Sequence, residues 1–286
     1  MQAKPSSSGG IDPIEAERAA YYDAAAEMTD YLSVSTGPET FLLPTSDRGL
    51  SRGLFARRSR SDITHLGRAV RLLSDAGFAL EGSVFLDVGA NIGTTTISAL
   101  RRHSFDSAVS IEAVATTARV LRMNVALNDL EHRVQVITAA VGSREHTAAV
   151  RLKKNVGGSE VVASGSRDST SAPVVPLNSL VDSGMIDIDR LGLVWVDTAG
   201  HEAEVLAGAS KLVAAQVPIV LRFRRRSLNE SIEHGSMQAL AASYTTAIDL
   251  KTSLRMTLAE FEASAREHPR SHRILLQAAG TTVHGS

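Results

Sequence analysis

The stretch Val84–Gly93, VFLDVGANIG, decides how this sequence folds. A short apolar run ends in a loop that holds Gly89 and Gly93, and a helical segment, residues 94–102, follows directly. Glycine lets a loop backbone approach a ligand closely, and the start of a helix offers unpaired N–H groups. The motif therefore indicates a nucleoside-binding α/β fold. The alternative interpretation is a tight strand–helix turn that binds nothing, because short glycine motifs are frequent by chance.

Strand-like and helical segments alternate along the rest of the chain. Strands are predicted at residues 108–112, 134–137, 191–197 and 217–223, and helices at residues 116–128 and 202–215. This alternation predicts a mostly parallel sheet with helices on both faces. The buried side of the helix at 116–128 is expected to consist of Val120, Met123, Val125 and Leu127.

The chain divides into three predicted parts. Residues 1–12 are rich in Ser, Gly and Pro and are expected to be disordered. Residues 13–78 are predicted to form a helical and irregular N-terminal cap, with helices over 14–32 and 63–77, the second capped by Asp62 and stopped by Gly77. Residues 79–286 are predicted to form the ligand-binding domain, interrupted by a β-rich insertion at about 147–176.

Composition excludes several classes of function. A net charge of −1 provides no field that would gather nucleic acid or a membrane surface, so neither partner is expected. The chain has no cysteine and no HExxH spacing, so no metal site is expected. No apolar run reaches the roughly 20 residues of a membrane span and no signal peptide is visible, which predicts a cytoplasmic protein. Homo-oligomerisation stays open.

Two acidic residues accompany the glycine loop. Glu112 ends the second predicted strand, 19 positions after Gly93, where a carboxylate accepts hydrogen bonds from ribose hydroxyls in nucleoside-binding folds. The alternative interpretation of Glu112 is a solvated carboxylate at the end of a strand. Asp87 lies within the first strand and is expected to orient the loop or a ligand amine, or to cap the next helix. The GxxxG spacing lacks a glycine of the dinucleotide motif, which favours S-adenosylmethionine over the ligand of a nucleotide-dependent oxidoreductase.

A second group of polar residues follows the strand at 191–197. Asp197, His201 and Glu202 lie in the segment VDTAGHE, which again opens a predicted helix. The carboxyl ends of parallel strands meet at one edge of a sheet, so these residues are expected near Gly89 and Glu112. A hydroxyl that accepts a methyl group must lose its proton, and a histidine or a carboxylate can take it. Asp197 and His201 both remain candidates for this base. The alternative role for Asp197 and Glu202 is to complement the helix N-terminus.

The order of motifs over residues 80–223 resembles the FkbM family of S-adenosylmethionine-dependent methyltransferases. These motifs are VFLDVGANIG, IEA, LRMNVALN, VQVITAAVG, VPLNSL, LVWVDTAGHEAEVLAGA and VPIVL. The resemblance implies a Rossmann-like class I methyltransferase fold and O-methylation of sugar or polyketide-type hydroxyls.

The resemblance also implies roles for individual residues. The methionine-side loop would consist of Asp87, Gly89, Ala90, Asn91 and Gly93. Glu112 would hold the ribose, Ala139 and Ala140 would flank the adenine, and Asn124 would support the site. Asp197, His201 and Glu202 match the second acidic motif and are the catalytic candidates.

The sequence departs from the family pattern at three places. Ala113 replaces a proline after the ribose-binding glutamate, and Thr198 and Ala199 stand in the middle of the second motif. Arg222 stands where the fifth strand usually ends in a carboxylate, which reverses the local charge. Two hypotheses follow: an active O-methyltransferase for a small hydroxylated acceptor, including an acidic one, or a catalytically degenerate binding or scaffolding protein.

Overall fold

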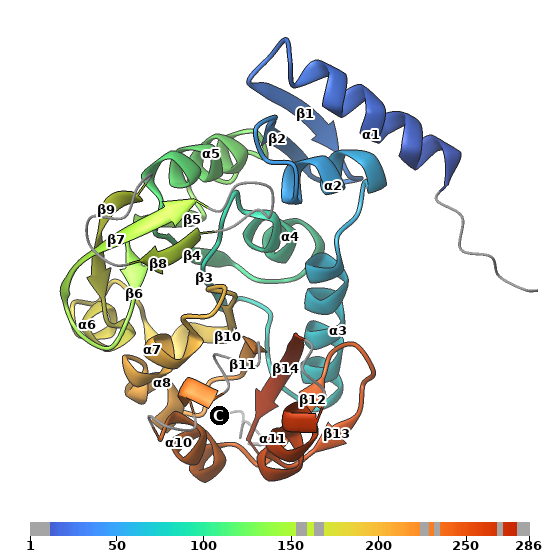
Figure 1. Ribbon diagram of the computed structural model, residues 1–286. Coiled ribbons are helices and arrows are strands. Elements are labelled where there is room, and N and C mark those ends of the chain that lie inside the picture. Colours follow the sequence, from blue (N-terminus) through green and yellow to red (C-terminus); the bar gives the residue numbers. More distant parts are fainter. Residues whose placement is uncertain are drawn as a thin grey trace, which may run out of the picture.

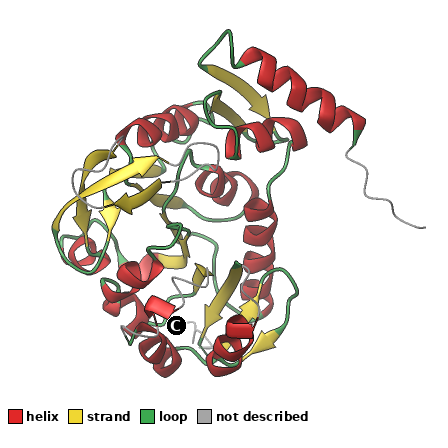
Figure 2. Ribbon diagram, viewed as in Figure 1, coloured by secondary structure: helices red, strands yellow, loops and turns green. Residues whose placement is uncertain are grey.

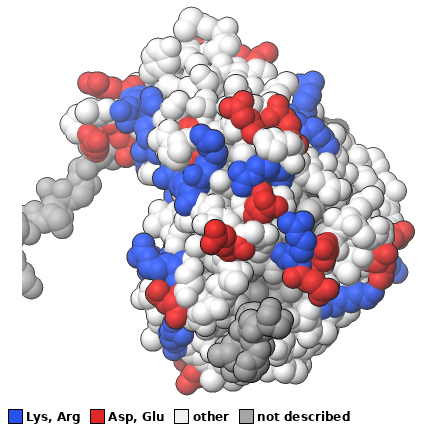
Figure 3. Space-filling view, turned by 180° about the vertical axis from the view of Figure 1, so that it is seen from behind, with Lys and Arg blue, Asp and Glu red and all other residues white. Residues whose placement is uncertain are grey.

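The computed structural model describes residues 12–152, 159–162, 169–223, 229–231, 235–267 and 271–278 (Figure 1). Disorder was predicted for residues 1–12; residues 1–11 lie outside the described ranges, and Asp12 is the N-cap residue of the first helix. Within the described residues, no helix is long and apolar enough to cross a membrane. On the face in Figure 3, basic and acidic side chains are interspersed, in keeping with the small net charge.

Eight strands form the central sheet, in the order β13-β12-β14-β11-β10-β3-β4-β5. Their bounds are β3 (Val84–Val88), β4 (Ser107–Glu112), β5 (Val134–Thr138), β10 (Leu191–Val196), β11 (Ile219–Phe223), β12 (Thr246–Asp249), β13 (Arg255–Met256) and β14 (His272–Gln277). The five strands β11, β10, β3, β4 and β5 run parallel to one another. At the other end of the sheet, β14 runs antiparallel to both β11 and β12. This confirms the predicted Rossmann-like α/β fold with a mostly parallel sheet.

Helices cover both faces of the sheet, so the domain has three layers (Figure 2). One face carries α3 (Ser61–Asp75), α4 (Thr94–Arg102) and α5 (Ala115–Ala126). The other carries α6 (Leu177–Asp182), α7 (Glu202–Ala207), α8 (Ser210–Ala214), α10 (Ser236–Ser243) and α11 (Leu258–Glu267), and a short helix η1 (Ile188–Arg190) precedes β10. Side chains of β3 alternate between the two apolar cores, with Leu86 in one and Phe85 in the other. Because β3 is buried on both faces, its sequence is a continuous apolar run, and this run predicted the strand.

The N-terminal cap consists of α1 (Pro13–Ala25), the hairpin β1 (Tyr31–Ser35) and β2 (Thr40–Pro44), and α2 (Leu50–Arg57). The predicted helix over 14–32 was too long. It ends at Ala25, because the sequence YLSVS that begins at Tyr31 alternates apolar and polar residues with a period of two and pairs as a strand.

The second cap helix, α3, begins at Ser61, two residues before Ile63, where a helix capped by Asp62 would begin. Arg60 is its N-cap residue, and the Asp62 carboxylate lies in the first turn, so the predicted cap is wrong. The predicted stop is confirmed, because Gly77 follows the last turn with a φ of +87°.

The predicted buried side of α5 was wrong in part. Val120 and Val125 are buried, but Met123 and Leu127 are 40% and 48% exposed. The buried face instead includes Leu121 and a polar residue, Asn124. A pattern search that follows apolar residues alone therefore misplaces this face.

Two asparagines of α5 take the place of a third strand beside the cap hairpin. The Asn124 side-chain amide accepts a hydrogen bond from the Leu42 N–H and donates to the Leu42 carbonyl, at 2.6 and 3.2 Å. Asn128 makes the same pair of bonds with Thr40, at 3.0 and 2.7 Å. Asn124 also donates to the Ile92 carbonyl at 2.9 Å, which links the hairpin to the glycine loop.

The predicted β-rich insertion forms a separate four-stranded sheet in the order β6-β9-β7-β8. Its strands are β6 (Ala140–Val141), β7 (His146–Leu152), β8 (Ser159–Val162) and β9 (Ser169–Val175). The predicted helix over 202–215 is two helices, α7 and α8, separated at Gly208. A Cβ at Gly208 would collide with the Gly142 carbonyl, so the junction between α7 and α8 packs against the residue that follows β6.

We expect Asn128→Ala to lower the free energy of unfolding by about 1–3 kcal/mol, because it leaves the half-buried Thr40 N–H and carbonyl without their partners. Denaturant unfolding followed by circular dichroism measures this. The control is Arg119→Ala on the exposed side of the same helix, which should change stability by no more than about 0.5 kcal/mol. Equal stability of the two variants would contradict the role of the amide.

Candidate functional site

The strand order reverses between β3 and β10, and the candidate site lies at this point. From β3 the chain adds β4 and β5 on one side, and later it adds β10 and β11 on the other. Open α/β sheets bind ligands beyond the carboxyl ends of the strands where the order reverses. A cavity of about 450 Å³ lies there, and both the loop after β3 and the loop after β10 line it.

The loop after β3 has three residues in the left-handed region: Gly89, Asn91 and Gly93, with φ of +85°, +53° and +91°. A Cβ at Gly89 would lie 2.5 Å from the Asp197 carbonyl oxygen, and one at Gly93 would collide with Leu121. We expected these glycines to make room for a ligand, but the room is filled by protein. Gly89, Ala90 and Asn91 line the cavity and Gly93 does not.

Asp87 lies behind this loop and does not line the cavity. Its Oδ2 accepts hydrogen bonds from the Thr95 and Thr96 hydroxyls, both at 2.6 Å, which ties β3 to the first turn of α4. Its Oδ1 is buried without a partner among the described residues. Burial raises the pKa of Asp87 to about 6, against the lowering effect of the two hydroxyls.

Glu112 ends β4 and its carboxylate lines the cavity. Oε2 accepts a hydrogen bond from the Asn91 N–H and Oε1 from the Val114 N–H, both at 2.9 Å. Burial raises the pKa of Glu112, while these N–H donors act in the opposite direction. A carboxylate offers about four acceptor positions, so each oxygen can still accept a hydroxyl donor. Ala139 and Ala140 line the same cavity beyond Glu112.

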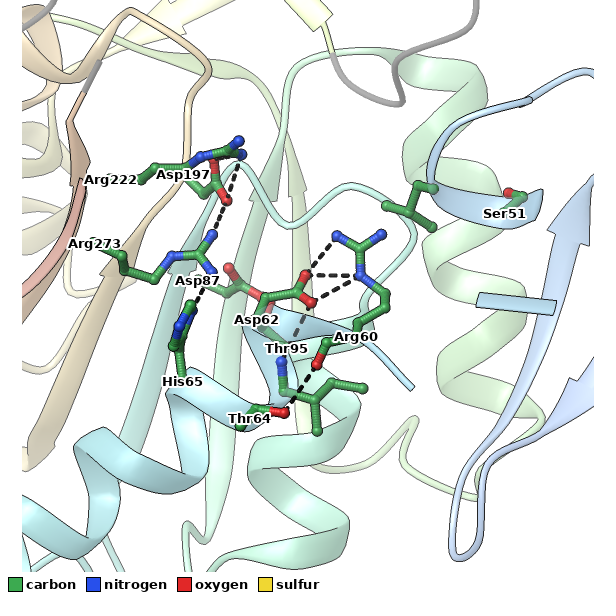
Figure 4. Close-up of polar contacts among 12 residues, drawn as sticks. Ser51, Arg60, Asp62, Thr64, His65, Asp87, Thr95, Asp197, Arg222 and Arg273 are labelled. Carbon is green, nitrogen blue, oxygen red and sulfur yellow. Dashed lines mark hydrogen bonds and ion pairs between the residues drawn. The ribbon is translucent and has the colours of Figure 1, made fainter. Parts of the chain in front are cut away.

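Asp197 follows β10 and lies between two guanidinium groups (Figure 4). Its Oδ1 is 3.0 Å from Arg222 Nη1, and its Oδ2 is 2.5 Å from Arg273 Nη2. Arg273 lies opposite Arg222 in the antiparallel pairing of β14 with β11, and its Cζ lies 4.9 Å from the centroid of the Trp195 ring. The carboxylate therefore offsets the charge of the arginine that departs from the family pattern.

The other two catalytic candidates lie in different places. His201 lines the cavity, and burial lowers its pKa, so the ring is neutral at pH 7. Glu202 is fully buried, does not line the cavity, and accepts a hydrogen bond from the Gly200 N–H at 3.1 Å. The structure brings Asp197 and His201 to the cavity and places Glu202 behind its wall.

The cap contributes an ion pair that sequence reasoning missed. Arg60 and Asp62 make two parallel hydrogen bonds, Nε to Oδ1 at 2.8 Å and Nη2 to Oδ2 at 2.7 Å, and both residues line the cavity (Figure 4). Asp62 is 5% exposed. No local pattern marks this pair, because only the docking of α3 onto the sheet brings it to the site. Among the described residues, no group of three or more His, Asp or Glu is placed to hold a metal ion.

Several solved structures are similar to this chain at low identity. A methyltransferase FkbM from Methylobacillus flagellatus is 15% identical, with a TM-score of 0.45 over 68% of this chain and 43% of that protein, so this chain spans less than half of its length. An O-methyltransferase from Bacillus cereus in complex with SAH is 16% identical, with a TM-score of 0.40 over 95% of this chain and 93% of that one. TYW2 from M. jannaschii in complex with AdoMet is 14% identical, with a TM-score of 0.44 over 87% and 85%.

No curated protein matches the sequence. The family model described as the methyltransferase FkbM domain matches residues 87–253, which is more than half of the chain. That match begins at Asp87 and includes both loops that line the cavity. The chain therefore belongs to the FkbM methyltransferase family.

Proposed function

We propose that this chain is an S-adenosylmethionine-dependent methyltransferase that methylates a hydroxyl of a small acceptor. One observation carries this proposal: Glu112, the loop at 89–91 and His201 line one cavity at the reversal point of the sheet. A carboxylate for the ribose, a backbone loop for the methionine part and a neutral imidazole for the acceptor proton are then within one site.

The cavity lining fits a sulfonium nucleoside. Glu112 would accept hydrogen bonds from the ribose hydroxyls, Gly89, Ala90 and Asn91 would lie along the methionine part, and Ala139 and Ala140 would flank the adenine. Gly93 and Asp87 would support the loop from behind. When bound, S-adenosylmethionine supplies an electrophilic methyl group.

His201 is the base in this proposal. Its imidazole would take the hydroxyl proton of the acceptor, while bound S-adenosylmethionine would supply the methyl group. A pKa lowered by burial keeps the ring unprotonated and ready to accept it. Asp197 is already paired with two guanidinium groups, so we assign it the positioning of Arg222 and Arg273. The rest of the rate would come from holding two reactants aligned.

The hypothesis of a catalytically degenerate protein rested on Arg222 and Ala199. The Arg222 guanidinium is paired with Asp197 at 3.0 Å, and this contact offsets part of the positive charge that would face a cationic cofactor. This contact favours an active enzyme over a disabled relative. The oxidoreductase alternative still lacks its second phosphate-binding glycine in the loop.

Glu112→Gln should weaken S-adenosylmethionine binding by roughly 10- to 100-fold, because it removes a charged acceptor for the ribose and places an amide against N–H donors. Isothermal titration calorimetry measures the affinity. Glu131→Gln, an exposed glutamate that does not line the cavity, is the matched control and should bind as the wild type does. Unchanged affinity in Glu112→Gln would remove the ribose assignment.

The two base candidates differ in their effect on the pH profile. With the pKa of His201 lowered, the active neutral form persists to a pH below the ordinary 6.5, so kcat/KM should rise with pH through that lower value and then level. His201→Gln should lower kcat by roughly 10²- to 10⁴-fold and abolish this rise.

Asp197→Asn should keep the rise in kcat/KM, because the imidazole is unchanged. Both variants are compared by methyl transfer from labelled S-adenosylmethionine to a panel of hydroxylated acceptors. Loss of the rise in Asp197→Asn, with its retention in His201→Gln, would make Asp197 the base instead.

A further inference from the structure

A second cavity of about 390 Å³ adjoins the first on the side of β11 and β14. Four residues line both cavities: Arg60, Ser61, Asp62 and Arg222. The second cavity continues between the start of α3, the turn after β12, α11 and the beginning of β14. A molecule that reached the methyl-transfer site from this side would extend into it.

The lining of this second cavity has an excess of positive charge. Arg60, Arg222, Lys251 and Arg273 line it, against the carboxylates of Asp62 and Asp249. Asp197 lies behind the two arginines of β11 and β14 and adds a third negative charge. One positive charge therefore remains in excess, in a chain whose formal net charge is −1.

Among these cations, Arg273 gives the strongest evidence for an anion site. Its side chain is only 10% exposed, and its Nε is buried without a hydrogen-bond partner among the described residues. The same guanidinium donates to Asp197 and contacts His65 Nδ1 at 3.2 Å (Figure 4). It also lies over the Trp195 ring. Burial and the neighbouring Arg273 lower the pKa of His65, so its ring is neutral and does not compete for an anion as a cation would.

Holding a buried arginine beside a second one is costly, and an oxyanion next to the two guanidinium groups would offset their remaining charge. The remaining lining includes apolar side chains, Met256 and Phe261, which suits the body of a small organic molecule. The cavity is thus cationic at its junction with the first cavity and partly apolar elsewhere.

We propose that the second cavity binds an oxyanion carried by the methyl acceptor, a carboxylate or a phosphate ester, at Arg222 and Arg273. This inference rests on the proposed function, because it makes the second cavity the acceptor subsite of the methyltransferase. It narrows the acceptor class to hydroxylated molecules with an acidic group.

The experiment uses Trp195, the single tryptophan of the chain, as a local reporter, since Arg273 lies over its ring. The full chain is titrated with inorganic phosphate and, separately, with acetate at constant ionic strength while tryptophan fluorescence is recorded. We expect a saturable change for one of the two anions, with a dissociation constant on the order of 1 mM. The anion that saturates distinguishes a phosphate ester from a carboxylate.

Arg273→Gln should weaken this binding at least about tenfold. If that variant does not fold, Lys251→Gln, at an exposed position in the same lining, decides the outcome by the same weakening. Arg190→Gln is the matched control: it removes an equal charge from an exposed pair with Asp106 that lines neither cavity, and should leave the response unchanged.

No saturable change with either anion in the wild-type chain, or an equal loss in the Arg190→Gln control, would overturn the proposal. Calorimetry with S-adenosylmethionine on the same protein separates the two possible failures. Cofactor binding without anion binding removes only the acceptor subsite. Anion binding without cofactor binding removes the proposed methyltransferase activity and with it the acceptor assignment.

Discussion

The site depends on one close contact between two loops. The loop after β3 packs against the loop after β10 where Gly89 lies opposite the Asp197 carbonyl, and a Cβ at Gly89 would lie 2.5 Å from that oxygen. Any side chain there would push the two loops apart. With glycine, the loop that supports Glu112 and the loop that carries His201 line a single cavity. The relative positions of Glu112 and Asp197 therefore depend on glycine, which has no Cβ, at position 89.

A chain of charges extends from this contact. Asp197 is held by Arg222 and Arg273, and on the cap side Arg60 is held by Asp62. Removing one partner of such a partly buried pair leaves the other charge uncompensated, so the members depend on one another more than each contact alone suggests. The Arg222 guanidinium, which departs from the family pattern, forms an ion pair with Asp197. Its exchange for the usual acid changes the chemistry of the neighbouring space, where one carboxylate, Asp197, faces two guanidinium groups.

The sequence predicted the central domain well because its signals are local. A strand buried on both faces is a continuous apolar run, and the turn after β3 needs glycine, so VFLDVGANIG identified both the strand and the loop. Glu112 followed from its place at the end of a strand. The buried face of helix α5 was predicted less well. Asn124 is buried because its amide forms hydrogen bonds, and Met123, although apolar, is exposed.

Residues that meet only through tertiary structure were not predictable. Arg273 lies 76 positions after Asp197, and their contact depends on β14 being inserted antiparallel beside β11. Arg60 and Asp62 are neighbours in sequence, yet only the docking of α3 brings them to the cavity. Asp62 was therefore interpreted as a helix cap, the role that its local sequence allows. A single sequence holds no signal for such contacts.

The asparagine pair of α5 has a consequence for how the molecule opens. Side-chain amides of Asn124 and Asn128 hold β2, in place of a continuous ladder between the cap hairpin and the central sheet. Four hydrogen bonds on one helix can break together while the eight-stranded sheet stays whole. Detachment of the hairpin would also break the Arg102–Glu39 ion pair and expose the buried Phe41 and Leu43. Since Asn124 also bonds the Ile92 carbonyl, such detachment would loosen the glycine loop from behind and couple the exposure of the cap to the release of whatever that loop holds.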